Sequence, residues 1–150
     1  MPALEDKLIE LTEKHAAQLS EMWCNAVRIN PRTPSYHPQD HDFCVSHAFD
    51  FYKSLKRIYS DEKPYPAVTA FFNRFAEESY LSNIPLNEAV YAVIMMRRQI
   101  WLYADIQALC VTPIEHQQAV ASITKTIRIF DHGIYAVITR YLELEAEKKT

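Results

Sequence analysis

The stretch that decides the fold is residues 113–148, which read PIEHQQAVASITKTIRIFDHGIYAVITRYLELEAEK. Within it, apolar residues recur at alternating intervals of three and four, at Val120, Ile123, Ile127, Phe130, Ile134, Val137, Tyr141 and Leu144. This interval places one apolar stripe along an α-helix. At ~1.5 Å per residue the helix would be roughly 50 Å long, more than the ~30 Å that a small domain needs. The pattern therefore predicts a long C-terminal helix whose charged last turns project from the domain.

Upstream of this stretch, prolines and capping residues divide the chain into further helical patterns. Apolar stripes predict helices over residues 4–29, 40–59, 67–81 and 85–110, with Asp40 as an N-cap and Pro85 in the first turn of the fourth. Residues 30–39 contain three prolines and predict an ordered, extended connector. We therefore expect residues 1–150 to form one all-α domain of about five helices, either globin-like or a helical bundle.

The composition excludes several function classes. Gly133 is the one glycine in the chain, so the sequence cannot form a glycine-rich phosphate-binding loop. The formal net charge of -3 gives no long-range attraction to nucleic acids or anionic lipids, and no apolar run is long enough to cross a membrane. The three cysteines, Cys24, Cys44 and Cys110, are odd in number and far apart, as expected in a reducing compartment. We expect a cytoplasmic protein with neither a nucleic acid nor a membrane as partner.

Arg97 and Arg98 interrupt a predicted helix that is otherwise apolar nearly all round. A buried guanidinium group must find a partner. In one interpretation, one arginine reaches solvent while the other pairs with Asp105 or Glu78, or lies on Trp101. In the other, one of them anchors the anionic group of a ligand in an aromatic cavity. The candidate ligand-binding residues are Arg97, Arg98, Trp101, Trp23, Phe72 and Tyr103.

Gly133 lies within the last predicted helix, where glycine costs roughly 1 kcal/mol relative to alanine. With Ser122, Thr126 and Ala136 it forms a strip of small residues that would let another helix approach closely, within the fold or across a two-fold axis. Alternatively, the glycine kinks or ends the helix. We expect a homodimer, and the predicted oligomer or output helix carries Ile123, Ile127, Phe130, Gly133, Ile134, Val137 and Tyr141.

Metal, haem and catalytic sites have little support in the sequence. His41, Cys44 and His47 fall on one side of the second predicted helix, but no other cluster completes a tetrahedral metal site. A globin-type haem lacks its proximal ligand, because no histidine occurs between His47 and His116. Nucleophilic catalysis has only scattered candidates, such as Ser46 beside His47. We therefore expect no cofactor, no metal and no enzymatic activity.

Short motifs spread over residues 8–145 carry a resemblance to a known family. They are Trp23, Pro31 with Ser35 and Tyr36, Pro85-Leu86 with Glu88, Arg97-Arg98 with Ile100-Trp101, and Phe130 with Tyr135 and Tyr141. Together they resemble the N-terminal sensor domain of RsbRD-type RsbT co-antagonists. The resemblance implies an all-helical input module that precedes a STAS, PAS or histidine-kinase output region in bacterial stress signalling. Related sensor domains have a globin-like fold without haem, and the family has no catalytic set to carry over.

Three hypotheses for the function remain. The leading one is a non-catalytic signal-transduction input domain whose last helix passes a change in packing to a downstream kinase, STAS or PAS output module, in cis or in trans. The others are a stand-alone helical protein that binds a small molecule other than haem, and a protein-interaction scaffold. A projecting last helix would favour the first, an enclosed cavity the second, and a solid core with an exposed apolar groove the third.

Overall fold

The computed structural model describes residues 12–60, 63, 65–106 and 113–149. All regular structure in these residues is helical. The elements are α2 (Ala16–Val27), the 3-10 helix η1 (Pro34–Tyr36), α3 (His41–Ser60), α4 (Tyr65–Leu81), α5 (Leu86–Ile106) and α6 (Pro113–Lys148). The predicted all-α domain with a long C-terminal helix is confirmed.

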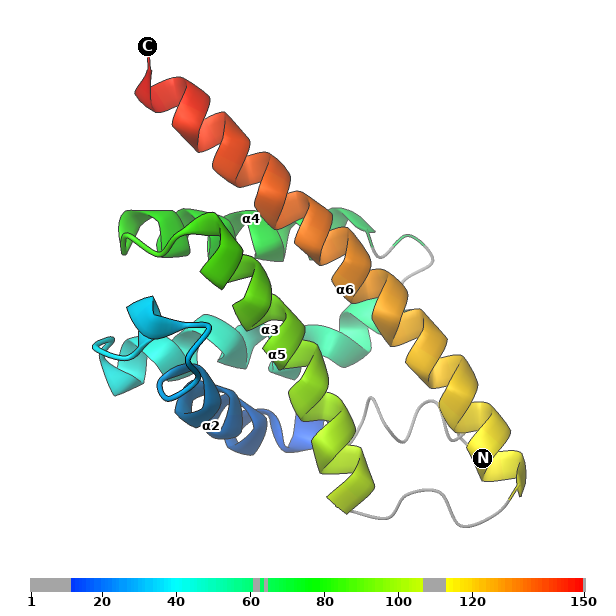
Figure 1. The fold of residues 1–150 in the computed structure, drawn as a ribbon. Helices are drawn as coiled ribbons and strands as arrows, with labels where there is room; N and C mark the ends of the chain where they lie inside the picture. The colour runs from blue at the N-terminus through cyan, green and yellow to red at the C-terminus, as the bar shows by residue number, and fades with distance from the viewer. Residues whose placement is uncertain (1–11, 61–62, 64, 107–112, 150) are drawn as a thin grey trace.

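The helices form two packed pairs that α5 joins. α2 packs on α3, α4 packs on α6, and α5 contacts both α2 and α6. In Figure 1, α6 runs diagonally across the molecule over α4, with α5 beside it. No helix in the described part of the chain is long and apolar enough to span a membrane.

Local capping fixes most of the helix boundaries. Asp40 caps α3 as predicted, since its Oδ2 accepts a hydrogen bond of 3.3 Å from the backbone N–H of Phe43. At the end of α4, Asn83 adopts the left-handed conformation with φ 60, and the backbone N–H of Ile84 donates to the carbonyl of Ser79. Pro85 directly precedes α5. These boundaries agree with the sequence pattern because capping and proline signals act within a few residues.

The first helix differs from its prediction. Residues 4–29 were expected to form one helix, but α2 begins at Ala16, after a turn at His15 with φ -108 and ψ 27. Residues 12–14 are helical before this turn, and residues 1–11 lie outside the described part of the chain. The apolar stripe continues through the turn, so periodicity alone could not reveal the break.

The connector of residues 30–39 was predicted to be extended, but it consists of tight turns and the 3-10 helix η1, because its backbone N–H groups bond to carbonyl groups three residues earlier. The buried Thr33 hydroxyl donates to the carbonyl of Val27 over 2.7 Å. The backbone N–H and the hydroxyl of Ser35 both donate to the Glu88 carboxylate, each over 2.7 Å. The connector is therefore attached to the end of α2 and to the first turn of α5.

Aromatic rings from α3, α4 and α6 form one cluster within the core. Neighbouring ring centroids lie 5.0–6.4 Å apart in a cluster of Phe51, Phe71, Phe72, Phe75 and Phe130. Three other buried aromatic residues direct their polar atoms at backbone carbonyl groups. Trp23 Nε1 donates to Ala92 over 2.8 Å, and the hydroxyls of Tyr52 and Tyr141 donate to Met96 and Ile84 over 2.7 Å. These bonds keep the buried polar atoms satisfied.

Helix α6 continues through Gly133 without a break, so the alternative that this glycine ends the helix is wrong. Gly133 is buried, and a Cβ atom built on it would overlap Cε2 of the Phe72 ring. Thr126 and Ala136 of the small-residue strip are buried as well. The strip therefore lets α4 approach α6 within one chain, rather than serving a two-fold axis.

The predicted oligomer residues of α6 mostly face the interior of their own domain. Phe130, Val137 and Tyr141 are buried, Gly133 packs against Phe72, and Ile127 and Ile134 are half-buried. The side chain of Ile123 lies outside the described residues. The apolar stripe is thus largely covered by α4 and α5, because a single domain core uses the same spacing as a coiled coil. The homodimer stays a prediction, and the buried members of the stripe are not available to form it.

Candidate functional site

The six candidate ligand-binding residues do not come together in one cavity. Trp23 and Phe72 are completely buried: Trp23 is bonded to α5, and Phe72 is packed against Gly133. The side chains of Trp101 and Tyr103 lie outside the described residues. Trp23 and Phe72, which were predicted to line a cavity, are instead packed in the core.

The two arginines of α5 separate. Arg97 Nη1 lies 3.7 Å from Oδ1 of Asp131 on α6, in a partly exposed ion pair, instead of pairing with Glu78. The side chain of Asp105, the other predicted partner, lies outside the described residues. Arg98 is exposed and folds back about two turns along α5, where its Cζ lies 5.7 Å from the ring centroid of Tyr91. Its Nη1 is 3.5 Å from the Tyr91 hydroxyl oxygen. Arg98 therefore points toward the connector instead of the core.

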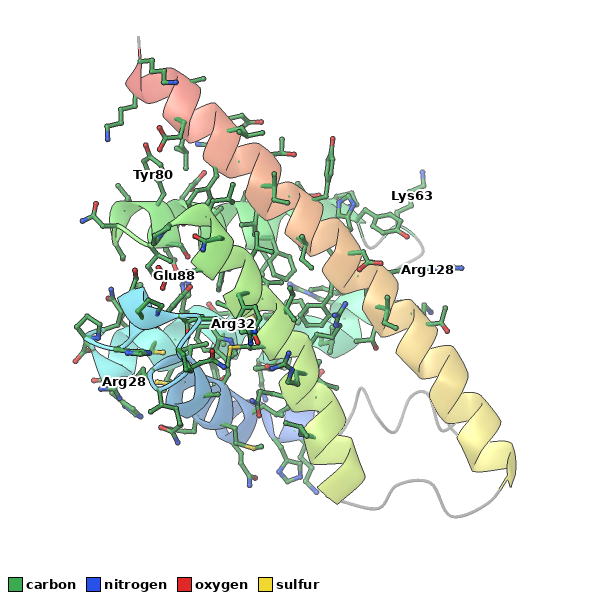
Figure 2. All side chains as sticks on the ribbon, in the orientation of Figure 1. Arg28, Arg32, Lys63, Tyr80, Glu88 and Arg128 are labelled. Atoms are coloured by element: carbon green, nitrogen blue, oxygen red, sulfur yellow. The ribbon has the colours of Figure 1, made fainter. Side chains whose placement is uncertain are left out.

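Tyr91 is also approached from the connector. The Cζ of Arg32 lies 5.7 Å from the same ring centroid. The ring lines a hollow of about 480 Å³ together with Pro31, Arg32, Pro34, Asn87 and Glu88. In Figure 2, Arg32 and Glu88 lie where the connector meets α5, whereas Arg128 lies across the molecule on α6. We call this the Tyr91 hollow, defined by these lining residues; Arg98 does not line it but contacts its Tyr91 side chain.

Around the Tyr91 hollow, the Glu88 carboxylate has hydrogen-bond partners, whereas the two arginines have no carboxylate partner among the described residues. The Arg98 guanidinium lowers the pKa of Tyr91, partial desolvation opposes this shift, and Arg32 lowers the pKa further. Glu88 is 6% exposed, and both of its carboxylate oxygens accept hydrogen bonds from Ser35. Among the described residues, neither Arg32 nor Arg98 forms an ion pair with a carboxylate.

A second polar cluster joins α3 to α4. His47 Nδ1 lies 2.7 Å from Oε2 of Glu78, and its Nε2 lies 3.1 Å from the hydroxyl oxygen of Ser79. With the proton on Nδ1, the ring donates to the carboxylate and accepts from the serine hydroxyl. Burial lowers the pKa of His47, and the Glu78 carboxylate opposes that shift. The hydrogen bond to His47 in turn lowers the pKa of Glu78.

This order of serine, histidine and carboxylate matches that of a serine hydrolase triad. Ser79 is completely buried, however, so a substrate cannot reach its hydroxyl in this conformation. Ser46, which the sequence had placed beside His47, donates to the carbonyl of Phe43 instead. The cluster therefore acts as a buried hydrogen-bonded link between two helices.

The three candidate metal ligands, His41, Cys44 and His47, lie in different environments. His41 is exposed and lies 2.8 Å from Glu21, whose hydrogen bond raises the pKa of the imidazole. Cys44 is buried beside Cys24, and burial raises the pKa of its thiol. His47 belongs to the cluster with Glu78 and Ser79. In the part of the chain that the structure describes, no three histidine, cysteine or acidic side chains are arranged to hold a metal ion.

A second hollow lies where α6 leaves the domain. It has a volume of about 300 Å³ and is bounded by the end of α4, the turn before α5 and the last turns of α6. The Tyr80 hydroxyl, at the end of α4, is shielded from solvent and has no hydrogen-bond partner among the described residues. Burial raises the pKa of Tyr80, as does the nearby Glu145 of α6.

Sequence reasoning found Arg98 but missed its neighbours at the Tyr91 hollow. Glu88, Tyr91 and Arg98 are spaced by three and seven residues, which places them on one helix face and was a signal in the sequence. Arg32 joins them only through the folding of the connector. No family model, curated protein or solved structure matches this chain.

Proposed function

We propose that this chain is a non-catalytic input domain for signal transduction, which relays a change in packing through α6 to a downstream output module. The observation that carries the proposal is α6 itself, a single helix of 36 residues. Its middle is buried against α4 and α5, and residues 145–149 are exposed at its end. In Figure 1 these last turns extend past the end of α4. Such a helix connects the core mechanically to whatever follows or docks.

Two contacts fix the position of α6 relative to α4. The Phe72 ring sits directly over Gly133, so α6 cannot slide or rotate unless this ring moves. Nearer the exit, Arg140 lies 2.8 Å from Glu77 of α4 and 2.9 Å from Glu143 of α6. A tightly packed core offers discrete alternatives instead of gradual deformation, which is what a two-state relay needs.

The identity of the output module comes from the family resemblance. The resemblance to the RsbRD-type sensor domain supports a STAS, PAS or histidine-kinase region, in cis or in trans, in bacterial stress signalling. We place the domain in the cytoplasm on the cysteine usage and the composition. The alternative function, small-molecule binding without relay, is favoured by the Tyr91 hollow.

The test is a helical-phase experiment. The full chain is fused through α6 to the output helix of a histidine kinase, and one to seven residues are inserted after Lys148. Each inserted residue rotates the output by about 100°, and seven residues restore the phase to within about 20°. We expect kinase activity to change with one to three inserted residues and to return with seven. The matched control carries the same insertions behind a flexible glycine-serine linker, which transmits no rotation.

The relay also predicts that a perturbation inside the domain reaches the kinase. In the fusion without insertions, Gly133→Ala should change kinase activity, and Phe72→Leu combined with it should move the activity back toward the parent value. If kinase activity changes neither with the number of inserted residues nor with these two substitutions, the relay is refuted.

The proposed homodimer needs a face of α6 that the domain leaves open. Tyr135 and Leu142 are 68% and 61% exposed, and Ile138 between them is half-buried on the same side of the helix. Light scattering should give the mass of a dimer at high micromolar concentration and of a monomer for the double variant Tyr135→Ser and Leu142→Ser. Leu81→Ser, at an exposed leucine at the end of α4, is the control. A monomeric parent protein would remove the dimer from the proposal.

A further inference from the structure

We propose that the Tyr91 hollow binds a small organic anion, whose carboxylate or phosphate group is held by Arg32 and Arg98 while its apolar part lies against the Tyr91 ring and the connector prolines. The site is independent of the relay, because it requires nothing of α6.

The first argument is charge. Arg32 and Arg98 each bring Cζ to 5.7 Å from the centroid of one ring, which concentrates two positive charges in a chain whose formal net charge is -3. The nearest carboxylate lining the hollow, Glu88, has both oxygens bonded to Ser35 and is 6% exposed. Two guanidinium groups beside one ring raise the local positive potential, which favours the binding of an anion there.

The second argument is that the backbone under Arg32 is already ordered. The Arg32 backbone N–H donates to Oδ1 of Asn30 over 2.8 Å. The ring of Pro31, the residue before Arg32, fixes its own φ angle. Thr33 and Ser35, on the following residues, are bonded to α2 and α5. A preordered site loses less conformational entropy on binding, so it can hold a small ligand with few contacts.

The third argument concerns which ligand fits. A guanidinium group binds carboxylate and phosphate oxygens in a two-point geometry, whereas it repels cations. The Tyr91 ring and the rings of Pro31 and Pro34 supply flat apolar surface for a compact hydrocarbon or aromatic group. A volume of about 480 Å³ suits a small organic molecule. The Asn87 side chain adds an amide that can donate or accept one further hydrogen bond.

The experiment is isothermal titration calorimetry of the full chain with phenyl phosphate, benzoate and inorganic phosphate, each up to about 10 mM, an affinity range that a small ligand reaches. We expect saturable binding of phenyl phosphate or benzoate that is tighter than the binding of inorganic phosphate. Tighter phenyl phosphate binding would assign a phosphate-bearing ligand, and tighter benzoate binding a carboxylate-bearing one.

Variants separate this site from general charge attraction. Arg32→Gln and Arg98→Gln should each weaken binding by about tenfold or more, the loss expected for one charge-assisted hydrogen bond. Arg128→Gln removes an exposed arginine on α6 with the same change of net charge, and it should leave the affinity unchanged. Tyr91→Phe keeps the ring and should cost less than either arginine variant.

Two outcomes would overturn the site. One is the absence of saturable heat with all three anions. The other is an equal loss of affinity in Arg128→Gln and in the two hollow variants, which would indicate non-specific attraction. Both arginines are exposed, so thermal unfolding of the variants should match that of the parent protein and confirm that they are folded.

Discussion

Gly133→Ala tests the packing on which the position of α6 depends. The new methyl carbon would overlap Cε2 of the Phe72 ring and would lie 2.5 Å from Cδ2 and 2.9 Å from Cζ. All three contacts are shorter than two unbonded carbon atoms tolerate. The ring cannot swing aside freely, because Phe72 is completely buried and contacts Phe51, Phe71, Phe75 and Phe130.

Two opposing effects set the size of the change. Alanine is favoured over glycine in a helix interior by about 1 kcal/mol. Overpacking a dense core typically costs about 1–3 kcal/mol, and the closeness of these contacts puts this site near the upper end. The free energy of unfolding should therefore fall by about 2 kcal/mol, which for a domain of this size lowers the melting temperature by roughly 4–8 °C.

Urea unfolding followed by circular dichroism at 222 nm measures this change. The control is the same substitution in a Phe72→Leu background, where the leucine leaves room for the methyl group. There Gly133→Ala should be neutral or stabilising by up to about 1 kcal/mol, since only the helix propensity remains. If Gly133→Ala stabilises the parent protein by this amount, the Phe72 ring does not lie over Gly133 and the reasoning fails.

Three further predictions concern the buried polar groups. Glu88→Gln should lower the free energy of unfolding by about 1–3 kcal/mol in urea titrations, because the amide accepts only one of the two hydrogen bonds from Ser35 and carries no charge. An unchanged midpoint would contradict this attachment. Burial lowers the pKa of His47 from its ordinary value of 6.5, so the unfolded chain binds a proton first and stability should fall as the pH drops below that value. The lowered pKa of Glu78 adds a further loss below its ordinary value of 4.5. His47→Gln should reduce the loss of stability below pH 6.5. If the stability of this variant falls with pH just as that of the parent protein does, His47 is not the group responsible. Cys24 and Cys44 are completely buried, so mass spectrometry after brief alkylation of the native protein should find both unlabelled, whereas rapid labelling would show that α2 and α3 separate readily.

The sequence predictions failed mainly where the structure depends on contacts between residues that are far apart in the chain. The stripe of α6 was correctly identified as helical, but its spacing could not tell a partner helix of another chain from α4 and α5 of the same chain. Arg98 stays a candidate ligand-binding residue, and its neighbour Tyr91 could be placed from the sequence only as a residue on the same helix face. The pairing of His47 with Glu78 and Ser79 had no signal at all, because 31 and 32 residues separate them along the chain.

By itself, the sequence determined where most helices begin and end and that the last one is long, because proline breaks, caps and apolar periodicity act over a few residues. The tertiary structure alone decided that the Phe72 ring occupies the space left by Gly133, that Ser79 is sealed from substrate, and that Arg32 meets Arg98 around Tyr91. These arrangements depend on how the helices pack together, which fixes the distance between side chains that no local pattern relates.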